Sequence, residues 1–314
     1  MRAVWLTEFG GPEVLVPGEA PDPVPDEGQV LIEVEFVNIT FVETQMRSGG
    51  GPAPVKLEPP VIPGNGVGGV VAKVGAGVDG GLVGRRVVSS TGGTGAYAEK
   101  AAVDAKGLFE VPDGLALDDA VALLADGRTA AMMVSAAAPR PGERVLVEAA
   151  AGGVGTLLVQ LAKMRNATVV AAAGGARKTE AAMRLGADEA VDYREPGWAG
   201  KAGGVDVVFD GVGGAVAREA FGLLRGGGRM VSFGLASGEW ASIADEEAAG
   251  RGVTLVRSTA TPDQLREFTR SALEEAAKGR LRPVIGQRFP LEGAADAHRA
   301  IESRSTVGKT LLEL

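Results

Sequence analysis

The chain has 314 residues, of which 45% are hydrophobic and 48 are glycine, and its formal net charge is -8. This length is enough for a large core in two domains, and the composition argues against disorder. The acidic balance, without a block of basic residues at either terminus, argues against nucleic acid or an anionic membrane as a partner. No uninterrupted apolar run reaches the roughly 18 residues of a membrane span, and the first residues lack the pattern of a signal peptide. We therefore expect a cytoplasmic protein.

The sequence contains no cysteine and one histidine, His298. It therefore provides neither a thiolate nor a multi-histidine zinc site, and we expect no metal. A serine nucleophile paired with His298 is disfavoured, because the sequence contains no G-x-S-x-G elbow. His298 lies in a helical-looking stretch, where we expect a packing or helix-surface role.

The chain falls into three stretches of different character. Residues 1–122 are rich in Gly, Pro and Val, and the alternating runs VLIEVEFV (30–37) and GGVVAKVG (68–75) indicate a mainly antiparallel β domain. In residues 123–261, apolar strands alternate with helical segments, which predicts a parallel sheet with crossover helices. Residues 262–314 contain an amphipathic helix, a second helix and a terminal strand, and we expect them to return to the first domain.

The middle stretch contains six predicted strands, at 144–149, 168–173, 189–193, 205–210, 229–234 and 253–258. Six strands suit a doubly wound dinucleotide-binding fold. After the first strand, Ala150, Gly152 and Gly155 occupy the spacing of G-x-G-x-x-G, with alanine in place of the first glycine. The second position lets the backbone approach a pyrophosphate, and the third lets the helix pack closely on the strand. We therefore predict a dinucleotide site at this turn.

The end of the second strand indicates which dinucleotide binds. Residues 166–179 contain no acid, although an NAD-binding fold usually has one there for the ribose hydroxyls. Gly174 and Gly175 leave room for the additional phosphate of NADP, and Arg177 and Lys178 are suited to neutralise it. The alternative, a solvated cation pair, is less favourable because positive charge at a helix N-terminus opposes the helix dipole. The pattern favours NADPH over NADH.

Six segments together resemble the medium-chain dehydrogenase/reductase superfamily: GAYAE (95–99), PGERVLVEAAAGGVGTLLVQLAK (141–163), LGADEAVDY (185–193), GGVDVVFDGVGG (203–214), RGGGRMVSFG (225–234) and VGKTLLEL (307–314). Within it, the chain is similar to the zinc-free, NADPH-dependent quinone oxidoreductases of the zeta-crystallin type. The resemblance implies an α/β protein. A GroES-like, mainly β substrate domain would comprise residues 1–122 plus 262–314, and a Rossmann NADPH-binding domain with a doubly wound parallel sheet would comprise residues 123–261. It also implies a homodimer formed by sheet edges.

The resemblance implies cofactor contacts in several groups. They are Lys178 and Tyr193 at the adenosine phosphate; Gly152, Gly153 and Val154 at the pyrophosphate; Thr129, Gly213, Phe233 and Gly234 on the nicotinamide side; and Arg257 and Arg304 near the cofactor. Together with Gly174, Arg177 and Lys178 at the second strand, these residues form the predicted NADPH site.

The departures from the family lie on the substrate side. Thr40 and Gln45 stand where the family has Asn and Tyr, and Gly66 stands where it usually has Glu. Arg128 replaces an apolar residue. Arg128 either faces the pocket and binds an anionic or carbonyl-bearing substrate, or pairs with Asp126 while Asp126 caps the following helix. Thr40, Gln45 and Arg128 are therefore the candidate substrate-binding residues.

The predicted reaction is hydride transfer from NADPH to a quinone, for which the protein aligns donor and acceptor. No side chain is assigned as catalytic, and the product proton is expected from solvent or from a hydroxyl such as that of Thr40. Two alternatives stay open. One is a reductase of enones or enoyl thioesters, for which Arg47, Lys56 and Arg128 would offer a basic entrance, and the other is a non-catalytic NADPH-binding sensor.

Overall fold

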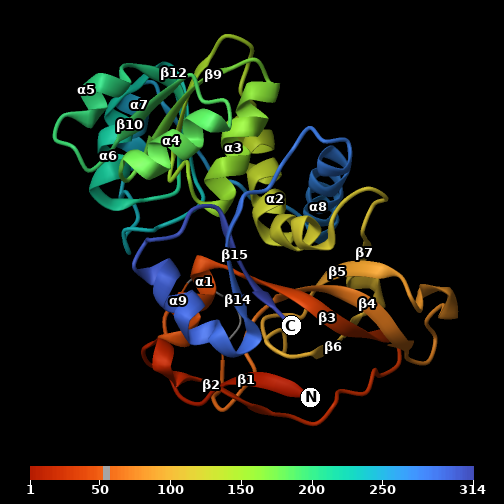
Figure 1. Cartoon of the computed structure of the whole chain (residues 1–314). Coiled ribbons are helices and arrows are strands. Elements are labelled where there is room, and N and C mark those ends of the chain that lie inside the picture. Colours follow the sequence, from red (N-terminus) through yellow and green to blue (C-terminus); the bar gives the residue numbers. More distant parts are fainter. Residues whose placement is uncertain (52–56) are drawn as a thin grey trace. The chain divides into compact units, whose positions relative to one another are not determined.

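The structure is a computed structural model that describes residues 1–51 and 57–314 (Figure 1). The chain divides into two compact units. Unit 1 contains Met1–Ala125, Leu273–Arg280 and Val284–Leu314, and unit 2 contains Asp126–Ala272 and Leu281–Pro283. Each unit therefore has its own fold, and the two are described separately below.

Unit 1 consists mainly of antiparallel strands. They are β1 (Arg2–Leu6), β2 (Leu15–Glu19), β3 (Gln29–Ile39), β4 (Gly66–Val74), β5 (Arg86–Ser90), β6 (Lys100–Asp104), β7 (Phe109–Glu110), β14 (Ile285–Pro290) and β15 (Lys309–Glu313). Strands β1 and β2 pair with each other, and the larger sheet has the order β14-β15-β3-β4-β5-β7, with β6 also paired to β3. Only β14 and β15 pair in parallel within this sheet as described. The predicted antiparallel β domain is confirmed.

Strand β3 illustrates how the sequence forms this sheet. Val30, Ile32 and Val34 are buried in the core of unit 1, whereas Glu33 and Glu35 are exposed. This alternation is that of a strand with one face on the core and one face in water. Unit 1 also contains helices α1 (Phe41–Arg47) and α9 (Ala294–Glu302), and the short 3-10 helices η1 (Pro12–Val14), η2 (Gly80–Leu82), η3 (Ala105–Gly107) and η4 (Leu291–Gly293).

Unit 2 is a parallel sheet with helices between its strands (Figure 1). Its strands are β8 (Arg144–Glu148), β9 (Thr168–Ala173), β10 (Glu189–Asp192), β11 (Val205–Asp210), β12 (Leu224–Ser232) and β13 (Thr254–Val256). Its helices are α3 (Gly153–Met164), α4 (Ala176–Arg184), α5 (Trp198–Ala202), α6 (Gly214–Gly222) and α7 (Asp245–Gly250). The order β10-β9-β8-β11-β12-β13 is the doubly wound order, so the predicted dinucleotide fold is confirmed. The winding reverses between β8 and β11, which is where such sheets bind ligands.

Two longer helices, α2 (Leu117–Ala137) and α8 (Pro262–Ala277), each contain a boundary between the units. By length and composition alone, α2 is apolar enough to cross a membrane, and 56% of its most apolar window is buried inside the protein. The sequence has no uninterrupted run of this length, because Asp126 and Arg128 lie among the apolar residues of α2. Core helices of soluble proteins pass the same test, so α2 is weak evidence for a membrane span.

Candidate functional site

The turn after β8 has the close packing that its glycine motif predicts. Gly152 is the N-cap of α3, and the helix begins at Gly153. A β-carbon at Gly155 would collide with the carbonyl oxygen of Ala149 and lie 2.9 Å from Cα of Ala150. Helix α3 therefore packs against the end of β8 as closely as the third position of the motif requires. Backbone N–H groups at a helix start, together with the helix dipole, favour an anion.

A carboxylate from α2 also lies at this turn. A β-carbon at Gly153 would collide with Oδ2 of Asp126, which is buried. The expectation that Asp126 caps a following helix is wrong, because residues 117–137 form one continuous helix, and its carboxylate instead lies at the start of α3. Arg128 is partly buried, and burial lowers the pKa of its guanidinium while the charge of Asp126 raises it. Of the expected local arrangement, the cap is absent, while the charge of Asp126 does act on the guanidinium of Arg128.

The predicted adenosine-phosphate residues come together at the start of α4. Arg177 and Lys178 lie in its first turn, and Gly175, with φ +98°, is its N-cap. Tyr193 follows β10, and its hydroxyl oxygen lies 3.3 Å from the position that a β-carbon of Gly174 would take. The two glycines thus allow close approach by side chains that follow the neighbouring strand.

The same helix start includes an ion pair that the sequence reasoning missed. The Asp192 carboxylate accepts hydrogen bonds from Nε (3.1 Å), Nη2 (2.9 Å) and the backbone N–H (3.0 Å) of Arg194. It also accepts one from the backbone N–H of Gly175, and the bonds from Arg194 are the main reason why its pKa is lowered to about 2. A β-carbon at Gly175 would lie 2.9 Å from Cζ of Arg194. The sequence Asp-Tyr-Arg at the end of a predicted strand was the signal that could have indicated this ion pair.

Two buried carboxyl groups, those of Glu148 and Asp210, lie at the carboxyl ends of β8 and β11, the strands between which the winding reverses. Asp210 Oδ1 accepts from the backbone N–H groups of Val212 (3.0 Å) and Gly213 (2.7 Å), and Oδ2 accepts from Oγ of Ser232 (2.7 Å). Glu148 Oε2 accepts from the N–H of Val212 at 3.3 Å. Burial, and then the charge of Asp210, raise the pKa of Glu148 well above its ordinary value. The pair therefore holds the loop after β11, with Glu148 favoured in its neutral form.

The loops after β11 and β12 contain the predicted nicotinamide-side residues of these strands. Gly213 has φ +74°, and a β-carbon there would collide with the carbonyl oxygen of Glu239. A β-carbon at Gly211 would lie 2.9 Å from Cε2 of Phe233, and one at Gly234 would lie 2.9 Å from the carbonyl oxygen of Gly211. Gly213, Phe233 and Gly234 thus lie in two loops packed on each other at the carboxyl end of the sheet.

Two other predicted cofactor residues of unit 2 lie elsewhere. Thr129 is in α2, next to Arg128, and is partly buried. Arg257 donates to both carboxylate oxygens of Asp245, at 3.0 and 2.8 Å, and its side chain is 77% exposed. Arg257 therefore forms a surface ion pair.

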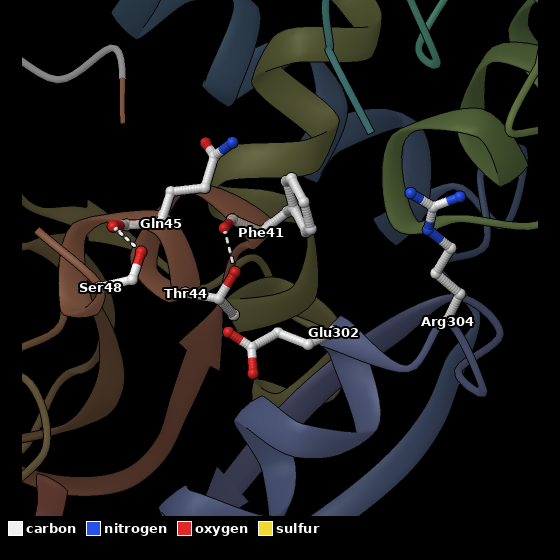
Figure 2. A pocket seen from close by; sticks show the side chains of 6 residues that line it. All are labelled: Phe41, Thr44, Gln45, Ser48, Glu302 and Arg304. Atoms are coloured by element: carbon white, nitrogen blue, oxygen red, sulfur yellow. Dashed lines mark hydrogen bonds between the residues drawn. The ribbon is translucent and has the colours of Figure 1, made fainter. Parts of the chain in front are cut away.

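Unit 1 contains a cavity of about 160 Å³ beside α1 (Figure 2). It is lined by Phe41, Thr44, Gln45, Ser48, Glu302 and Arg304. Figure 2 shows the residues of α1 and Ser48 on one side and Glu302 and Arg304, at and after the end of α9, on the other. Among the described residues, Oε1 of Gln45 is buried and has no hydrogen-bond partner. The cavity therefore joins a predicted substrate residue, Gln45, with a predicted cofactor residue, Arg304.

Thr40 precedes α1 and is bonded to a buried acid. Its backbone N–H and its hydroxyl both donate to Oε2 of Glu43, the hydroxyl at 3.0 Å, and the N–H of Asn65 donates to Oε1 at 2.9 Å. Burial raises the pKa of Glu43, whereas these bonds and the charge of Lys309 lower it. The sequence reasoning missed Glu43, although Thr-x-x-Glu before an apolar residue is the signature of a capping box.

The other departures from the family pattern have structural explanations. A β-carbon at Gly66 would collide with the side-chain amide of Asn38, so this side chain occupies the space that a longer residue would need. Arg47 is buried, and it donates to Glu302 and to the carbonyl oxygen of Gly10. The expectation that Arg47 lies at a basic entrance is therefore wrong, and Lys56 lies outside the described residues.

A GroES-like β unit and a doubly wound unit with this glycine turn define a reductase of the medium-chain class. Residues 26–113 match the family described as alcohol dehydrogenase GroES-like domain, and residues 185–312 match the family described as zinc-binding dehydrogenase. The chain is 36% identical to a probable quinone oxidoreductase of Schizosaccharomyces pombe, over 98% of this chain and 96% of that protein. It is 32% identical to a 2-haloacrylate reductase of a Burkholderia species, over 99% and 98% of the two chains.

A solved structure of Escherichia coli quinone oxidoreductase complexed with NADPH is also similar, with 30% identity, a TM-score of 0.90 and full coverage of both chains. The chain belongs to the medium-chain dehydrogenase/reductase superfamily, among the zeta-crystallin-like quinone oxidoreductases. The resemblance inferred from the sequence motifs is confirmed.

The residues of this chain do not fit the zinc ion in the description of one matching family. The sequence has no cysteine, and the Nε2 atom of its single histidine, His298, forms a hydrogen bond of 2.8 Å with the hydroxyl of Tyr97. Within residues 1–51 and 57–314, no three His, Asp or Glu side chains are grouped to hold a metal. His298 has the packing role that the sequence predicted.

Proposed function

We propose that this protein is an NADPH-dependent oxidoreductase that transfers hydride to a quinone without zinc. The observation that carries the proposal is the start of α4. Arg177, Lys178 and Tyr193 lie there beside Gly174, and β9 ends without an acid. The similarity to an NADPH-complexed quinone oxidoreductase supports the same cofactor and acceptor.

NADPH, when bound, supplies the hydride of its nicotinamide ring. We assign the pyrophosphate to the backbone N–H groups of Gly152, Gly153 and Val154, because a helix start binds anions. The loop of Gly213 and the turn of Phe233 and Gly234 would hold the nicotinamide side. Glu148 and Asp210 stabilise the loop of Gly213 by accepting hydrogen bonds from its backbone N–H groups. We also keep Thr129, Arg257 and Arg304 as proposed contacts, although the ion pair of Arg257 with Asp245 would have to open.

Unit 1 is proposed to bind the substrate through Thr40 and Gln45. The buried amide oxygen of Gln45 would accept a hydrogen bond from a hydroxyl of the reduced product. While Glu43 is ionised, the Thr40 hydroxyl donates to it and offers the substrate only lone pairs. When Glu43 is protonated, it donates to Thr40, and Thr40 is then able to give a proton to the product oxygen. The raised pKa of Glu43 extends this second state to a higher pH than an ordinary glutamate would allow. Replacing Thr40 with Val should then lower kcat for quinones, whereas delivery from solvent would leave kcat unchanged.

A second candidate is the reduction of an activated carbon–carbon double bond. The similarity to a 2-haloacrylate reductase favours it. Arg128 is suited to bind a carboxylate on such an acceptor, because a partly buried guanidinium forms strong bonds with carboxylates. The alternative of a sensor without turnover is not supported, since the similar proteins are named as reductases and oxidoreductases.

The test is the loss of nicotinamide absorbance with NADPH and with NADH, each offered 1,4-benzoquinone, a bulky ortho-quinone, a simple enone, a 2-haloacrylate and an enoyl thioester. Turnover of quinones with NADPH supports the first proposal, and turnover restricted to the unsaturated acids or thioesters supports the second. Alanine at both Arg177 and Lys178 should raise KM for NADPH roughly a hundredfold relative to NADH. The exposed Arg165, just after α3, provides the control Arg165→Ala. Equal effects on both cofactors would reject the phosphate assignment.

We also propose a cytoplasmic homodimer. In the described chain, β13 pairs only with β12, which leaves one edge of the sheet open, and Trp240 on the loop after β12 is 49% exposed. Sedimentation equilibrium would measure the mass, and a monomer at micromolar concentration would count against the dimer. The net charge of -8 supports a protein without nucleic-acid or membrane partners.

A further inference from the structure

The ion pair of Asp192 and Arg194 lies at the helix start where the adenosine 2′-phosphate is proposed to bind. Asp192 is the last residue of β10, and its carboxylate accepts a bond from the N-cap residue of α4, Gly175. An anion at a helix N-terminus satisfies N–H groups and complements the helix dipole. Asp192 therefore already occupies part of the position that suits a phosphate.

Arg194 lies over the glycine turn. The positions that β-carbons would take at Gly174 and Gly175 are 3.4 Å from Cδ and 2.9 Å from Cζ of Arg194, respectively. The guanidinium is therefore adjacent to the backbone at the start of α4. With Arg177 and Lys178 in the first turn, three cations and one carboxylate gather at this end of the sheet.

The two partners differ in exposure. The side chain of Arg194 is 63% exposed, whereas that of Asp192 is 16% exposed. A ligand therefore reaches the guanidinium more readily than the carboxylate. Because exposed ion pairs contribute little to stability, a phosphate with two negative charges competes well for the arginine.

We infer that Arg194 is a specificity-determining residue for NADPH, and that Asp192 positions its guanidinium at the start of α4 until the 2′-phosphate takes over its hydrogen bonds. The inference rests on the proposed function. NADH offers hydroxyls at this position and forms no ion pair with Arg194. The arginine therefore favours the phosphorylated cofactor and leaves NADH almost unaffected.

A purely structural role for Arg194 makes a different prediction. If the arginine only held the turn of Gly174 and Gly175, its loss would weaken NADPH and NADH alike and lower the stability of unit 2. The ratio of the two dissociation constants therefore separates the roles. A matched control is Arg225, which pairs with Asp206 at 3.2 Å and is 54% exposed. It lies near the amino ends of β11 and β12, whereas Arg194 lies at the carboxyl ends of the strands.

The experiment measures Kd for NADPH and NADH by nicotinamide fluorescence in the full-length wild type, Arg194→Met, Arg194→Lys and Arg225→Met. Competition with 2′,5′-ADP and 5′-AMP isolates the 2′-phosphate. We expect Arg194→Met to weaken NADPH and 2′,5′-ADP by roughly tenfold to a hundredfold, while NADH and 5′-AMP change by less than about twofold. Arg194→Lys should restore part of the loss, because it keeps the charge without the forked geometry. Arg225→Met should bind as the wild type does.

The outcomes separate this inference from the proposed function. If the wild type prefers NADPH and Arg194→Met keeps the full preference, or weakens both cofactors equally, the role of Arg194 is rejected and the cofactor assignment stands. If the wild type itself binds NADPH and NADH equally, the proposed cofactor preference fails, and the inference about Arg194 fails with it. Thermal unfolding of each variant verifies that the mutants are folded.

Discussion

Replacing His298 with Gln should remove an acid sensitivity from unit 1. His298 is 1% exposed, its Nε2 atom is bonded to the hydroxyl of Tyr97, and among the described residues Nδ1 has no partner. Burial, and then the charge of Arg47, lower the pKa of His298 from 6.5 to about 3. The imidazole therefore stays neutral in the folded protein near neutral pH. Glutamine is neutral at every pH and is able to bond to the Tyr97 hydroxyl.

The sign and size of the effect follow from linkage. Below pH 6.5, His298 is protonated in the unfolded chain, whereas in the folded chain it is protonated only below about pH 3. Stability is therefore lost as the pH falls through this window. A difference of one in pKa corresponds to about 1.4 kcal/mol. The whole window therefore amounts to about 5 kcal/mol, of which about 2 kcal/mol is lost between about pH 8 and about pH 5.

The assay is amide hydrogen exchange, read by mass spectrometry on peptides of α9, because it reports the opening of unit 1 separately from unit 2. Wild type and His298→Gln are compared at each pH, so that intrinsic exchange and all other titrations cancel. The wild type should lose about 2 kcal/mol more opening free energy than the variant between about pH 8 and about pH 5. An equal loss in both proteins would refute a buried neutral histidine.

The contribution of Glu148 to the stability of unit 2 should depend on pH in the opposite sense, because its raised pKa means that the unfolded chain releases the proton first and this contribution falls as the pH rises above about 4.5. Glu148→Gln should reduce this loss of stability with pH, as measured by urea unfolding that is monitored on peptides of unit 2. An unchanged dependence of the unfolding free energy on pH would contradict the raised pKa of Glu148. Arg128→Leu should raise KM for carboxylate-bearing acceptors roughly tenfold or more and leave neutral quinones unchanged, as steady-state kinetics would measure; unchanged turnover of every acceptor would end the pocket role. Gly155→Ala should destabilise unit 2 by about 1–3 kcal/mol and weaken NADPH and NADH alike, because the new methyl collides with the carbonyl of Ala149. Gly222→Ala meets open space and is the control in thermal unfolding.

The sequence predicted the fold because each stretch has a clear period. Alternating runs became β3 and β4, and all six apolar strands of the central stretch were found. Strands β9 and β11 have the predicted bounds, and the ends of the other four are displaced by one to five residues. The largest displacement is in β12, which begins at Leu224 instead of residue 229. Its first five residues are Leu-Arg-Gly-Gly-Gly, of which only Leu224 pairs with β11, before a shift in register. The glycines have low strand propensity, so the sequence did not indicate this extension.

The parts of the site that follow from local sequence were predictable. The glycine turn and the basic first turn of α4 are contiguous motifs, so the helix that carries them places them together. Contacts between distant segments were not predictable in this way. The Asp126 carboxylate meets Gly153 only because α2 packs beside the start of α3, and Arg194 meets Gly175 only because β10 lies next to β9. Glu43 is different, since its spacing from Thr40 was readable.

The carboxylate of Asp126 at the start of α3 has a consequence for how the cofactor exchanges. A negative charge already faces the partial positive charge of this helix end, so a pyrophosphate bound there would replace one anion by another. Less net charge is then neutralised on binding, and affinity should change less with ionic strength than the basic residues around the site suggest. The carboxylate also complements the dipole of α3 by itself. If the proposed pyrophosphate binds at this turn, the smaller electrostatic gain would favour release of the spent nucleotide.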